Sequence, residues 1–77
     1  EANWCYLQPV VEAAVAAAKA ELAKSEVVPA AIANIVSKAV DDFAQSYKLF
    51  EGKDATDAEL TAARNEIIGT VSRVTGA

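Results

Sequence analysis

The side chain of greatest intrinsic reactivity in this sequence is its single thiol, Cys5. A catalytic thiol needs a neighbouring base or cation that favours the thiolate. The chain contains no histidine, and its first basic residue is Lys19, so the sequence provides no activating partner. Two interpretations of Cys5 remain open: a small buried hydrophobic side chain, or a disulfide bridge to another chain.

The acidic residues are the next groups that could do chemistry. A calcium-binding EF-hand loop needs glycine at its sixth position and a bidentate acid at its twelfth. Counted from Asp54, these positions hold Glu59 and Asn65, so the spacing fails. Asp41 and Asp42 are adjacent, and adjacent helical residues point about 100° apart, which excludes a paired acid–base dyad. We therefore expect no catalytic residue, no metal site and no cofactor.

The charge balance excludes several classes of partner. Seven basic residues against eleven acidic ones give a net charge of −4, and the basic residues are scattered. Sequence-independent binding of nucleic acid requires clustered Lys and Arg, and docking on anionic lipid requires a basic helix face. No run of about 18 apolar residues occurs, so we expect no transmembrane segment.

The element that must position most of the large side chains is a long helix. The periodicity predicts this helix over residues 29–51, with Pro29 in its first turn and Gly52 as a left-handed cap. Apolar side chains recur along it at the three- and four-residue steps of one helix face. They are Ile32, Ile35, Val36, Ala39, Val40, Phe43, Tyr47 and Phe50.

Two further helices are predicted on either side of it. The first covers about 9–24, and its alanine-rich sequence favours close packing of helices. The third covers 57–75 and begins with a capping box, in which Thr56 and Glu59 each satisfy a free backbone N–H. Gly69 lies inside this third helix. It indicates either close approach of the backbone to another helix, or a position near a fraying helix end where glycine is tolerated.

Short connections favour antiparallel neighbours, so we predict an all-α, three-helix, up-down-up bundle in a single domain over residues 1–77. A short aromatic N-terminal arm, residues 1–8, precedes it. The arm has two interpretations: it folds back to plug one end of the bundle, or it inserts into another chain.

A chain of 77 residues can bury only a small core. Domains of this size often gain further stability from a disulfide, a metal or a partner. A single cysteine cannot form an internal disulfide, and the absence of histidine weakens the case for a metal. A partner is therefore the support that remains. We therefore predict a non-enzymatic structural or protein-interaction subunit whose small core is completed by a protein partner or by self-association as a homo-oligomer. Its candidate contact residues are Trp4, Cys5, Tyr6, Phe43, Tyr47 and Phe50.

The alternative function is a carrier that holds a small apolar ligand between its helices. The alanine-rich first helix facing larger side chains would leave the necessary space. The candidate lining residues are Val15, Ile32, Val36, Phe43 and Ile67.

The start of the sequence bears on its origin. The chain has no methionine and begins with Glu1, after which an initiator methionine is not normally removed. This favours a processed precursor or an excised fragment. Removal of a secretory or organellar targeting segment would place the chain in an exported or organellar compartment. Proteolysis of a precursor, or cloning of a fragment, would produce the same start without fixing a compartment.

Overall fold

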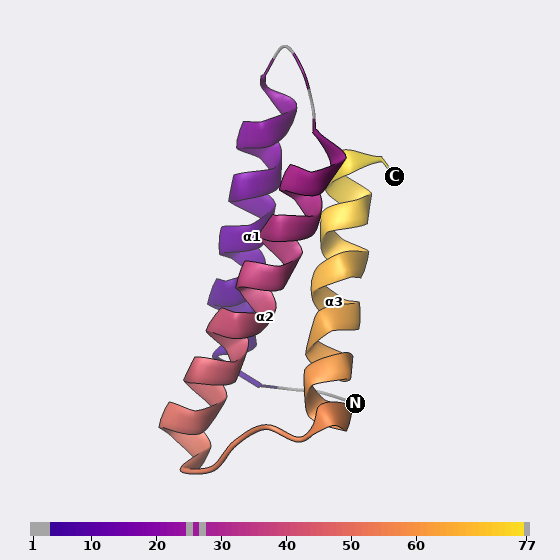
Figure 1. The fold of residues 1–77 in the computed structure, drawn as a ribbon. Helices are drawn as coiled ribbons and strands as arrows, with labels where there is room; N and C mark the ends of the chain where they lie inside the picture. Colours follow the sequence, from indigo (N-terminus) through magenta and orange to yellow (C-terminus); the bar gives the residue numbers. More distant parts are fainter. Residues whose placement is uncertain (1–3, 25, 27, 77) are drawn as a thin grey trace.

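Three helices account for most of the chain. The computed structural model describes residues 4–24, 26 and 28–76. Its helices are α1 (Leu7–Leu22), α2 (Pro29–Glu51) and α3 (Asp57–Thr75), and every pair of them is in contact. Their directions alternate along an elongated molecule of 42 × 20 × 19 Å (Figure 1). The predicted all-α, three-helix, up-down-up bundle is confirmed.

The bounds of α2 and α3 match the sequence predictions, because local signals set both ends. Pro29 occupies the first turn of α2. Gly52 ends that helix in the left-handed region, with φ 75°, and its N–H donates to the carbonyl oxygen of Lys48 at 2.9 Å. The capping box between Thr56 and Glu59 is present at the start of α3.

The predicted bounds of α1 were wrong by two residues at each end. The helix begins at Leu7, two residues before Pro9. The proline is tolerated there because it lies within the first turn, where backbone N–H groups have no intrahelical acceptor. It ends at Leu22, and the N–H of Ala23 closes the last turn on the carbonyl oxygen of Lys19 at 3.1 Å. The described arm is therefore residues 4–6, and residues 1–3 of the predicted arm lie outside the described residues.

The core lies where the three helix faces meet. Phe43 of α2 and Ile67 of α3 are its largest completely buried side chains. From α1 come smaller side chains such as Ala14 and Ala18, as its sequence implies. The remaining buried apolar residues are Tyr6, Leu7, Val10, Ala39, Tyr47, Ala63 and Val71.

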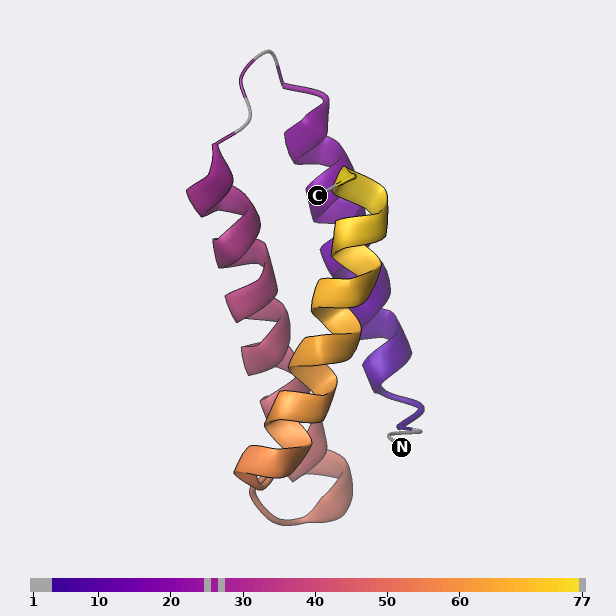
Figure 2. The same cartoon turned by 90° about the vertical axis from the view of Figure 1, so that its right-hand side faces the viewer.

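The two ends of the bundle differ in what they carry. The α1–α2 link lies at one end, with the C-terminus of α3 nearby (Figures 1 and 2). The α2–α3 link and the N-terminal arm lie at the opposite end, which we call the arm end. The aromatic residues of the sequence gather there.

Candidate functional site

An aromatic cluster closes the arm end. The ring of Trp4 lies 4.8 Å from that of Phe43 and 6.2 Å from that of Tyr47, measured between ring centroids. Tyr6 stacks on Phe43 at 5.9 Å. The arm thus folds back onto α2 and plugs this end of the bundle, which is the first of its two predicted interpretations.

Two carboxylates accept hydrogen bonds from the tyrosines of this cluster. The hydroxyl of Tyr6 donates to Oε2 of Glu51 at 3.0 Å, and that of Tyr47 donates to Oε2 of Glu59 at 2.6 Å. The other oxygen of Glu59 accepts the backbone N–H of Thr56 at 2.9 Å. Both ends of the α2–α3 link are therefore bound to tyrosines that belong to the core.

These contacts shift the ionisation of their members. The hydrogen bond to Glu59, with burial, raises the pKa of Tyr47 to about 12. Burial, followed by the hydrogen bond to Glu51, raises the pKa of Tyr6. The Tyr47 hydroxyl and the Thr56 N–H lower the pKa of Glu59 below its usual value. Both hydroxyls stay protonated at neutral pH, so these groups act here as structural donors and acceptors.

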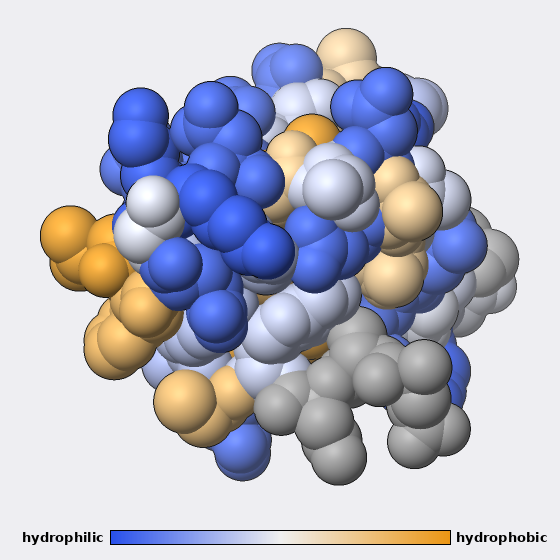
Figure 3. Space-filling model, turned by 90° about the horizontal axis from the view of Figure 1, so that it is seen from below, coloured by the Kyte–Doolittle hydropathy of each residue, from blue (hydrophilic) through white to orange (hydrophobic). Residues whose placement is uncertain are grey.

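Beside the cluster, two large apolar side chains face solvent. Leu49 is 83% exposed and Phe50 is 67% exposed, and we call this adjacent pair at the end of α2 the end patch. The ring of Phe50 stacks on that of Tyr6, with 5.1 Å between centroids and 3° between planes. Seen from the arm end, the surface is largely blue and hydrophilic, with strong orange at its left edge and smaller orange areas elsewhere (Figure 3).

The six predicted contact residues differ in how far they are buried. Tyr6, Phe43 and Tyr47 are buried within their own chain, so in this fold they have no free surface for a partner. Trp4 is half-buried, and Phe50 and Cys5 are exposed. The interpretation of Cys5 as a buried hydrophobic side chain is therefore wrong.

Leu49 is a surface residue that was not among the predicted contact residues. It belongs to the end patch but lies outside the apolar stripe of α2, which contains Tyr47 and Phe50. A leucine off the buried stripe of an amphipathic helix was the available signal, since such a position normally faces solvent.

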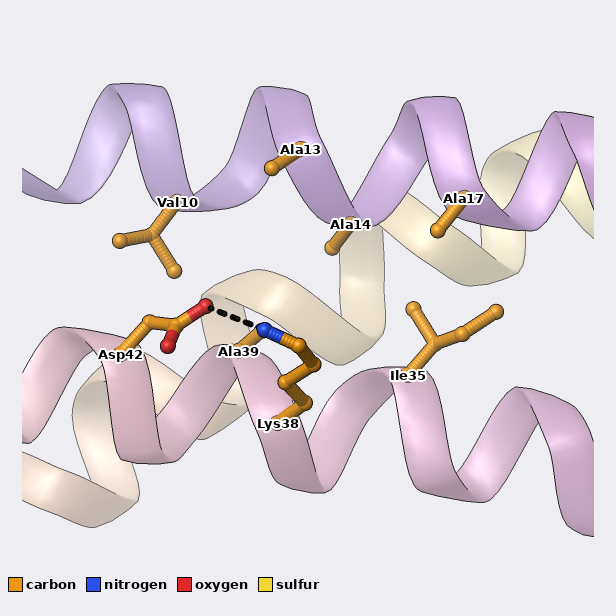
Figure 4. A pocket seen from close by; sticks show the side chains of 8 residues that line it. All are labelled: Val10, Ala13, Ala14, Ala17, Ile35, Lys38, Ala39 and Asp42. Carbon is orange, nitrogen blue, oxygen red and sulfur yellow. Dashed lines mark ion pairs between the residues drawn. The ribbon is translucent and has the colours of Figure 1, made fainter.

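A shallow groove of about 130 Å³ runs between α1 and α2 (Figure 4). Its floor is apolar and rich in alanine, and an ion pair of 3.6 Å between Lys38 and Asp42 lies at its rim. The lining residues are Val10, Ala13, Ala14, Ala17, Ile35, Lys38, Ala39 and Asp42. This set contains none of the residues predicted to line a ligand space. Phe43 and Ile67 of that predicted set are completely buried in the core.

A second groove, of about 150 Å³, lies between α2 and α3. Val36, from the predicted ligand-lining set, contributes to it, but Asp41 and Arg64 make its lining partly charged. It is therefore less suited to an apolar ligand than the groove between α1 and α2.

Within residues 4–24, 26 and 28–76, no group of three or more metal-ligating side chains comes together. No helix in this part of the chain is long and apolar enough to cross a membrane. Comparisons with models of protein families, with curated proteins and with solved structures find no match for this chain.

Proposed function

We propose that this chain is a non-enzymatic interaction subunit that associates with a second copy or another protein through the end patch. The observation that carries the proposal is the exposure of Leu49 and Phe50, 83% and 67%, at adjacent positions. Burial of a leucine or phenylalanine side chain contributes about 1.5–3 kcal/mol each. A partner that covers Leu49 gains most of this free energy, and covering Phe50 adds a smaller share because one face of its ring already packs on Tyr6.

The packing beneath Phe50 supports its role as an anchor. One face of its ring already rests on Tyr6, which in turn packs on the completely buried Phe43. An aromatic side chain held in place before binding loses less conformational entropy when a partner covers it. Aromatic anchors of this kind commonly dominate interface energetics.

The exposed Cys5 extends the proposal. It is the immediate neighbour of Tyr6, on which the ring of Phe50 is stacked. Under oxidising conditions its thiol is accessible for a disulfide bridge to a second chain, and the single cysteine excludes a bridge within the chain.

A carrier of a small apolar ligand is the second candidate. The alanine-rich lining of the groove between α1 and α2 favours it. The groove offers about 130 Å³, close to the engineered cavity of about 150 Å³ that holds benzene, so an apolar molecule of about that size would fit it.

The mass of the purified chain in solution tests both candidates. We would measure it by size exclusion with light scattering over a concentration series, with and without reductant. We expect an oligomer that the double variant Leu49→Gln/Phe50→Gln converts to a monomer. The control Ile68→Gln, which changes a 38% exposed residue on α3, should leave the oligomer intact.

The reductant and the variant Cys5→Ser distinguish a disulfide contact from a non-covalent one. Dissociation by either one assigns the contact to a disulfide. An oligomer that survives both but is lost in Leu49→Gln/Phe50→Gln depends on the end patch alone. A wild-type chain that stays a compact monomer throughout contradicts the proposal. Native mass spectrometry of that monomer with a bound apolar molecule would support the carrier instead.

A further inference from the structure

We draw no further inference here: the strongest candidate, the end patch of Leu49 and Phe50, belongs to the surface already assigned to the proposed function, and nothing in the structure shows what covers it.

Discussion

The hydroxyl of Tyr47 lies at the margin of an apolar core, where a polar group without a partner would be costly. Glu59 removes that cost by accepting a hydrogen bond from the hydroxyl at 2.6 Å, a short bond strengthened by the charge of the acceptor. The same carboxylate caps α3 through the backbone N–H of Thr56. One residue therefore joins the aromatic cluster to the start of the last helix.

This contact predicts a loss of stability in alkali. The pKa of Tyr47 is about 12 in the folded chain and about 10 when unfolded, so the unfolded chain loses its proton first. The stability from this shift is complete below pH 10 and is lost as the pH rises towards 12. The raised pKa of Tyr6 acts in the same direction. Urea denaturation followed by circular dichroism from about pH 8 upward should record the decline.

The variant Tyr47→Phe isolates the contribution of this hydroxyl. It should reduce the loss of stability at high pH. Tyr6→Phe should leave the share of that loss that comes from Tyr47 unchanged. The lowered pKa of Glu59 has the opposite sign: its stability is present above the usual glutamate pKa and is lost as the pH falls through the lowered folded value. Identical pH profiles for wild type and Tyr47→Phe would refute this account.

Among the helices, α3 has the most complete local start signal, and its cap can be tested by itself. The backbone N–H of Glu59 donates to the Thr56 hydroxyl at 3.2 Å. Thr56→Ala removes this acceptor, so we expect the free energy of unfolding to fall by about 1 kcal/mol. The control Thr61→Ala changes an exposed residue within the same helix and should not destabilise it. Urea unfolding of both variants makes the comparison, and equal midpoints would contradict a role for the cap.

Gly69 provides a second test of α3. A Cβ built at this position meets nothing within 4 Å, so close backbone approach within the chain does not explain the glycine. Gly69→Ala should therefore stabilise the bundle by about 0.5–1 kcal/mol through higher helix propensity. Gly52→Ala is the matched opposite case, because φ is 75° there and the change should destabilise. Thermal unfolding measures both, and a lower midpoint for Gly69→Ala would show that the position is constrained.

In the whole molecule, stability depends on a small core in which Phe43 is one of the two largest completely buried side chains. Phe43→Ala should cost about 3–5 kcal/mol, which is similar to the entire net stability of a domain of this size. We therefore expect a largely unfolded chain, measured by far-ultraviolet circular dichroism and by the fluorescence of Trp4.

The matched control for the core is Leu49→Ala. This residue is 83% exposed, so the folded chain should lose less than about 0.5 kcal/mol. The pair of variants separates core from contact surface, because Leu49→Ala should affect association more than folding. A folded Phe43→Ala variant would mean that the aromatic cluster is not essential to the fold.

The sequence by itself determined the three-helix architecture and the bounds of α2 and α3. Their signals are local: Pro29 and Gly52 set the backbone geometry at the two ends of one helix, and Thr56 opens the next within a single turn. The apolar period then requires each helix to bury one face. Helix periodicity and capping act over a few residues, so no distant contact was needed to predict them.

Only the tertiary structure decided which aromatic residues are interior and which are exposed. Phe43 and Phe50 share one predicted stripe, but Phe43 is completely buried with the rings of Trp4 and Tyr6 against it. Phe50, near the end of α2, has one face on Tyr6 and remains 67% exposed. The bonds from Tyr6 to Glu51 and from Tyr47 to Glu59 likewise depend on how the arm and the α2–α3 link fold back. Such placements depend on contacts between segments far apart in the chain, and a single sequence does not record which segments meet.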